Sequence, residues 1–191
     1  MKKILIASLC CMFLLIACDG KNGSGDNDGV LATDSIDMNF DDMSAFSLVN
    51  YGLNMQIMLP KVQSSTGASI EPEVKHDEGD YLWYLSIGPR FTLIIEDFGR
   101  EKNKLADERK RLNELDDIFN VEFLQDDDKV LMYKRTLHEG SGGKPSYHCY
   151  GTTEVDGYTY IFKTDQDGTF KPIVEDMVKT IRSAEPINID A

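Results

Sequence analysis

The chain has 191 residues with 33 acidic and 20 basic side chains, which gives a formal net charge of −13 at pH 7. This length is typical of one folded domain that buries a sizeable core. The acidic excess disfavours nucleic-acid binding, because proteins that bind nucleic acid neutralise phosphates with a basic surface. We therefore expect no nucleic-acid partner.

The N-terminus has the pattern of an export signal. Lys2 and Lys3 precede an apolar run of 14 residues, 4–17, and a polar segment begins at Asp19. The run is too short to cross a bilayer, which takes about 20 residues, but it suits a secretory signal peptide. The stretch Leu15-Ile16-Ala17-Cys18 resembles the lipobox of bacterial lipoproteins. That resemblance implies cleavage between Ala17 and Cys18 and attachment of lipid to the Cys18 thiol.

A lipid on Cys18 implies a location and one partner, the membrane. Two or more acyl chains bind a bilayer stably, so we expect a protein of the cell envelope, at the outer membrane or cell surface. Asp19 leaves an inner-membrane location open, because an acidic residue after the lipidated cysteine resembles a retention signal of enteric bacteria. An ordinary signal peptide, or a buried first helix with an accidental cysteine, is the alternative to lipidation.

Three segments are expected: a signal peptide at 1–17, a lipid-anchored flexible tether at 18–44, and a globular domain at 45–191. Loss of residues 1–17 removes two lysines, so 174 residues with a net charge of −15 are left. The tether is rich in Gly, Asn, Asp and Ser and has too few apolar side chains to offset its ordering entropy. Such a composition is typical of a random coil.

Periodicity predicts an α+β domain with an antiparallel sheet. Alternating apolar residues indicate strands, and apolar residues spaced three or four apart indicate helices. The predicted strands are Tyr51–Leu59, Ser69–Lys75, Tyr81–Ile87, Phe91–Glu96, Asn120–Gln125, Lys129–Leu137 and Ser146–Val155, followed by one through Tyr158 and Phe162. The predicted helices are Arg100–Asp117 and Phe170–Ser183.

The dipeptide Asp156-Gly157 is a strong signal for a two-residue hairpin turn. It places Val155 opposite Tyr158 and Cys149 opposite Thr164. Because opposed residues share a face, Cys149 joins an apolar side and is predicted to be a buried thiol. Removal of residues 1–17 and lipidation of Cys18 would leave this thiol as the last one, so no disulfide within the mature domain is expected.

The same register places His148 opposite Asp165 on the other side of the hairpin, as a candidate exposed polar pair. The adjacent His148 and Cys149 do not form a Cys/His nucleophile, because neighbours on a strand point to opposite faces. His148 and Asp165 could form an oriented base, yet no nucleophile accompanies them. Three scattered histidines do not predict a metal site. We predict no enzymatic activity, no cofactor and no metal.

The order of elements resembles the PsbP-like α/β/α fold. The resemblance is carried by Tyr51-Gly52-Leu53 leading to Leu59-Pro60, and by Tyr158-Thr159-Tyr160-Ile161-Phe162 followed by Phe170, Met177 and Ile181. It implies a single domain in which helices cover an antiparallel sheet. Members of this fold serve as photosystem accessory subunits, as a nuclear-import factor and as bacterial lipoproteins, so the resemblance assigns no functional residue.

Three functions follow as hypotheses. The first is a non-enzymatic accessory or binding lipoprotein that engages an envelope protein or a small ligand. The second is an immunity or inhibitor lipoprotein whose acidic surface caps a basic protein. The third is a hydrolase that uses His148 and Asp165.

Overall fold

The structure of the protein is a computed structural model that describes residues 36–63, 65, 67–115, 118–138 and 142–187. All of them lie in one compact unit, Thr33–Ala191. Two antiparallel sheets and two α-helices make up the described part of this unit, which confirms the predicted α+β class. The predicted signal peptide, Ala17, Cys18 and the tether as far as residue 35 lie outside the described residues.

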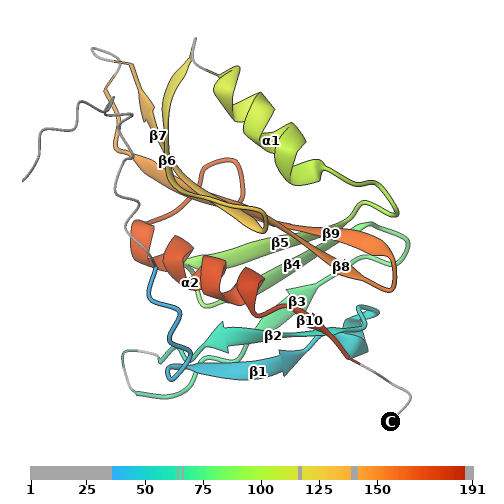
Figure 1. Ribbon diagram of the computed structural model, residues 1–191. Coiled ribbons are helices and arrows are strands. Elements are labelled where there is room, and N and C mark those ends of the chain that lie inside the picture. Colours follow the sequence, from blue (N-terminus) through green and yellow to red (C-terminus); the bar gives the residue numbers. More distant parts are fainter. Residues whose placement is uncertain (1–35, 64, 66, 116–117, 139–141, 188–191) are drawn as a thin grey trace, which may run out of the picture. The chain divides into compact units, whose positions relative to one another are not determined.

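The larger sheet has seven strands in the order β3-β4-β5-β9-β8-β7-β6, and the smaller sheet has the order β1-β2-β10. Figure 1 shows α1 on one side of the larger sheet and α2 on the other side, between the two sheets. The bounds are β1 (Met43–Ser47), β2 (Met55–Pro60), β3 (Glu73–Lys75), β4 (Leu82–Ile87), β5 (Phe91–Asp97), α1 (Lys104–Asn113), β6 (Phe119–Asp126), β7 (Val130–Leu137), β8 (Ser146–Val155), β9 (Tyr158–Lys163), α2 (Lys171–Arg182) and β10 (Glu185–Pro186), with a 3-10 turn at Val49–Tyr51.

The main core lies between the larger sheet, α2 and the smaller sheet. Leu53, Met55, Ile57 and Leu59 are all buried, so the alternation predicted for this segment is confirmed although β2 begins only at Met55. From α2 the core receives side chains spaced three or four apart, as an amphipathic helix requires. They are Val174, Met177, Val178 and Ile181.

Phe170 does not join this stripe and is 64 % exposed. It occupies the N-cap of α2 with extended backbone angles, so its side chain lies outside the helical face. The guanidinium of Arg90 lies 5.8 Å from the centre of its ring.

The hairpin register predicted from the Asp156-Gly157 turn is confirmed. Both turn residues have positive φ angles, 53° and 78°, as a type I′ turn requires. Val155 pairs with Tyr158, and the Thr164 N–H donates to the Cys149 carbonyl over 3.2 Å. Cys149 is 1 % exposed in the main core, as predicted.

The folded part starts earlier than residue 45. β1 begins at Met43, which is buried and pairs with Pro60, and Ile36 packs against the core. The predicted tether boundary at residue 44 missed this strand, because its isolated apolar residues show no clear period.

The first helix is shorter than predicted. Gly99 and Asn103 have φ angles of 63° and 65°, which end any helical path before Lys104. At the other end the helix stops at Asn113, and Phe119 opens β6. Neither helix in the described part of the chain is long and apolar enough to cross a lipid bilayer.

Substitution of Gly151 by alanine tests how closely α2 packs on β8. A Cβ atom at Gly151 would lie 2.5 Å from Cγ2 of Ile181 and 3.1 Å from the Lys129 carbonyl oxygen. We expect Gly151→Ala to lower the free energy of unfolding by about 1–3 kcal/mol, measured by urea denaturation. Thr153→Ala on the same strand is the control.

Truncation of Ile181 removes the atom nearest to the new Cβ. Gly151→Ala combined with Ile181→Ala should therefore lose less stability than the sum of the two single variants. Additive losses would show that α2 does not lie this close to β8.

Candidate functional site

His148 is buried, so the prediction of an exposed His148–Asp165 pair is wrong. The imidazole is 1 % exposed because the turn after β9 closes over it. A Cβ atom at Gly168 would lie 2.4 Å from Cε1 of His148, so only glycine permits this approach. The Asp165 carboxylate instead accepts the N–H groups of Asp167 and Gly168, at 3.1 and 2.9 Å.

The His148 ring is held by three polar side chains. Its Nε2 accepts the Nε–H of Arg135 at 2.9 Å and lies 2.8 Å from the Ser146 hydroxyl, and its Nδ1 lies 3.3 Å from the Thr164 hydroxyl. An Nε2 that accepts a hydrogen bond carries no proton, so the imidazole is neutral. Burial and then the Arg135 charge lower the pKa of His148 to about 4.

Tyr133 and Arg135 extend this arrangement along β7, two residues apart and on the same face. The Tyr133 ring stacks on His148 at 5.2 Å between centres and has Phe123 on its other side at 6.3 Å. The Arg135 guanidinium lies 5.1 Å from the centre of the Phe119 ring and donates to the Gln166 carbonyl. Both side chains are therefore fixed by their neighbours.

These residues border a pocket of about 560 Å³, which we call the arginine–tyrosine pocket. It lies on the α1 side of the larger sheet, where residues of β5, β7, β8 and β9 meet residues of the helix. Its volume is within the range of small-molecule sites. The lining residues are Ile94, Glu108, Arg111, Tyr133, Arg135, His148, Cys149, Tyr150, Lys163, Thr164, Asp165 and Gln166.

Two of the three cations at this pocket are neutralised by carboxylates. Glu108 lies on the buried stripe of α1 with Leu105 and Leu112, and it accepts two bonds from Arg111 at 2.5 and 2.7 Å. Lys163 forms an ion pair with Glu96. Arg135 forms no ion pair within the described ranges.

The two tyrosines carry hydroxyl groups that have no hydrogen-bond partner among the residues that the structure describes. Tyr133 is 5 % exposed and Tyr150 is 9 % exposed. Burial, and then the nearby Glu108 charge, raise the pKa of both phenols, so they stay protonated at neutral pH. A protonated phenol donates one hydrogen bond and accepts others. The pocket thus offers two donors and one unpaired guanidinium.

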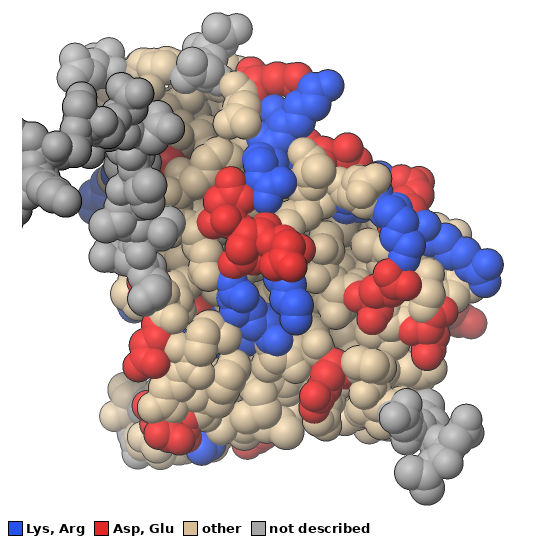
Figure 2. Space-filling view, in the orientation of Figure 1, with Lys and Arg blue, Asp and Glu red and all other residues tan. Residues whose placement is uncertain are grey.

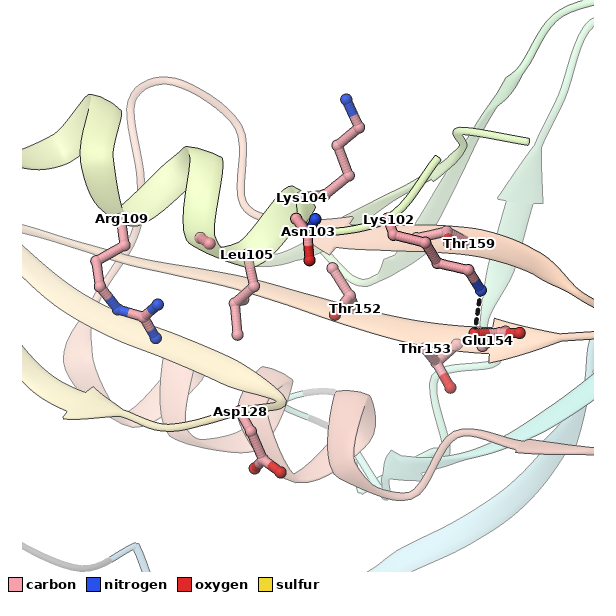
Figure 3. A pocket seen from close by; sticks show the side chains of 11 residues that line it. Lys102, Asn103, Lys104, Leu105, Arg109, Asp128, Thr152, Thr153, Glu154 and Thr159 are labelled. Atoms are coloured by element: carbon pink, nitrogen blue, oxygen red, sulfur yellow. Dashed lines mark hydrogen bonds and ion pairs between the residues drawn. The ribbon is translucent and has the colours of Figure 1, made fainter. Parts of the chain in front are cut away.

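A second pocket, of about 430 Å³, lies at the N-terminal end of α1 (Figure 3). Lys102 reaches across it to Glu154, and Arg109 binds Asp126 at 2.5 Å on the same side of the helix. Its cations are therefore compensated. Figure 2 shows the same interspersion of acidic and basic side chains on one face of the molecule.

Metal and thiol chemistry find no support in the geometry of this region. No group of three or more His, Cys, Asp and Glu side chains within the described ranges could hold a metal ion. Cys149 lies in the core on the opposite face from His148, and burial raises the pKa of its thiol to about 12. His76 stacks on Trp83 at 4.3 Å, and neither residue is in the lining of the pocket.

The structure brings both members of the predicted pair, His148 and Asp165, to the lining of this pocket, and sequence reasoning missed the other residues that define it. Tyr133 and Arg135 alternate on β7 opposite His148 and Ser146 on β8, and this pairing could have been found by extending the hairpin register to the next strand. Arg111 and Glu108 come from α1, and no local pattern places a helix over a particular strand. The arrangement as a whole is suited to binding a polar ligand.

The pKa of His148 makes a prediction for stability against pH. An unfolded histidine titrates near pH 6.5, so the unfolded chain binds a proton between about pH 6.5 and 4 that the folded protein does not. The contribution of the neutral imidazole is complete above pH 6.5 and is lost as pH falls towards 4, by up to about 3 kcal/mol. We expect the wild type to be more stable than His148→Gln above pH 6.5, and the difference between their free energies of unfolding to become smaller as the pH falls from 6.5 to 4.

Urea denaturation at several pH values measures this gap, because other titrating groups cancel in the difference. Parallel stability curves for the two proteins would show that His148 titrates normally.

Neither a model of a known protein family nor the sequence of a curated protein matches this chain. The function is therefore interpreted from the chemistry of the site.

Proposed function

We propose that this protein is a lipid-anchored, non-enzymatic binding protein of the cell envelope. The observation that carries the proposal is the arginine–tyrosine pocket. Its lining holds a fixed guanidinium that forms no ion pair and two tyrosine hydroxyls that have no hydrogen-bond partner among the described residues. A ligand would supply the missing partners.

The N-terminal sequence supports the location. Leu15-Ile16-Ala17-Cys18 has the features of a lipobox, and the Gly- and Ser-containing segment after it suits a tether. The lipid holds the domain at the outer membrane or cell surface, and the tether lets the pocket face the surrounding medium.

The α/β/α arrangement supports the PsbP-like resemblance at the level of the fold. A helix lies on each side of the seven-stranded antiparallel sheet (Figure 1). Accessory subunits and lipoproteins are among the members of that fold, and an accessory role for this protein belongs to the proposal. Fold alone assigns no ligand.

Lipidation is tested by Cys18→Ser in the producing cells. Wild-type protein should incorporate labelled palmitate and sediment with membranes, and the variant should incorporate none and be released from the membrane fraction. Cys149→Ser is the matched control and should behave as the wild type. Palmitate on the Cys18→Ser protein, or none on the wild type, would contradict the anchor.

Ligand binding is tested by native mass spectrometry of the full-chain protein isolated gently from the envelope. Wild type should carry a non-covalently bound mass. Ile94→Trp, which fills the arginine–tyrosine pocket, should lose that mass, and Thr153→Trp in the second pocket should retain it. Circular dichroism confirms that the variants fold, and identical spectra for all three proteins would contradict the proposal.

A further inference from the structure

Arg135 is held in place without being neutralised. A guanidinium has five N–H donors, of which one goes to His148 and one to the Gln166 carbonyl. Both acceptors are uncharged, and the third contact is the Phe119 ring. Three donors are left without an acceptor among the described residues. The chain has 33 acidic residues and 20 basic ones, yet the Arg135 guanidinium at this pocket has no acidic partner among the described residues.

Two tyrosine hydroxyls add donors to the pocket that holds this charge. Tyr133 and Tyr150 line the same pocket as Arg135. The Tyr133 ring is fixed between His148 and Phe123. A site whose donors are already oriented loses little entropy when it binds a ligand.

Ion pairing leaves one cation of the pocket without a carboxylate of its own. The pairs Arg111–Glu108 and Lys163–Glu96 are neutral, and Arg135 is the cation of the described lining that forms no ion pair. Asp165 also lines the pocket, but its carboxylate accepts the N–H groups of Asp167 and Gly168. Glu108 and Asp165 would repel a second negative charge on a ligand. A planar guanidinium also matches the two oxygens of a carboxylate, which it binds with paired hydrogen bonds.

We propose that the arginine–tyrosine pocket binds a small organic monocarboxylate, with its carboxylate on Arg135 and the hydroxyls of Tyr133 and Tyr150 as further donors. This inference rests on the proposed binding function and names the chemical class of its ligand. The rest of the ligand lies towards Ile94 and the Glu108–Arg111 pair.

Calorimetric titration of the full-chain lipoprotein in detergent tests the class directly. Benzoate and gluconate represent an apolar and a hydroxylated body, benzamide and glucose are their neutral counterparts, and inorganic phosphate is the other oxyanion. We expect at least one carboxylate to bind at least tenfold more tightly than its neutral counterpart and than phosphate.

Variants locate the carboxylate. Arg135→Gln should weaken binding of the carboxylate at least tenfold, and Tyr133→Phe, which removes only a hydroxyl, about three- to tenfold. Tyr133→Phe should keep the thermal stability of the wild type, because the deleted hydroxyl has no protein partner. Arg109→Gln in the second pocket is the matched control and should bind like the wild type.

Each contrary outcome has its own meaning. Tighter binding of phosphate, equal binding of acid and neutral counterpart, or unchanged affinity in both Arg135→Gln and Tyr133→Phe would overturn the inference. A neutral molecule found in the pocket by native mass spectrometry would overturn it while the proposed function stands. Absence of any bound mass together with no binding in any titration would remove both.

Discussion

The pairing of β8 with β7 and β9 is the constraint on which the rest of the structure depends. The Asp156-Gly157 turn sets its register, and the pleat then divides the side chains of β8 between two faces. Cys149 faces α2 in the core, and its neighbours His148 and Tyr150 face the side of α1. A shift of one residue would exchange these sets, which would place an imidazole in the apolar core. One register therefore builds both the core and the pocket.

The two faces of the sheet are covered unequally, and the pocket forms where the coverage ends. α2 and the smaller sheet cover one face, where most of the buried apolar side chains of the main core lie. On the other face α1 has only ten residues and packs on β7 and β8, whereas Tyr84 on β4 is exposed. Glu108 reaches down from the helix at this boundary and remains paired with Arg111. The pair brings charge to the edge of the pocket without leaving an isolated buried carboxylate, which would be costly.

Local signals in the sequence predicted most of the sheet and little of the site. Alternation found the strands, and the Asp-Gly turn gave a register that the structure confirms down to Val155 and Tyr158. The first strand was not predicted, because the apolar residues around Met43 show no regular spacing. The first helix was predicted too long, because charge and spacing do not reveal the positive φ angles of Gly99 and Asn103 that precede it. His148 was found but was expected at the surface. His148 is buried by the turn that contains Gly168. The alternation of residues along a strand does not reveal a contact with such a separate segment.

The chemistry that holds Arg135 explains why a neutral histidine matters to the pocket. A carboxylate in the place of His148 would fix the guanidinium equally well, but it would also cancel the charge that a ligand could use. A neutral imidazole, a backbone carbonyl and an aromatic ring position the same group and leave its charge intact. Burial is what keeps His148 neutral, and the Arg135 charge adds to this effect by disfavouring a second cation at 2.9 Å. The two residues thus support each other's state: the arginine charge adds to the burial that keeps the histidine unprotonated, and the unprotonated nitrogen accepts the hydrogen bond that orients the arginine.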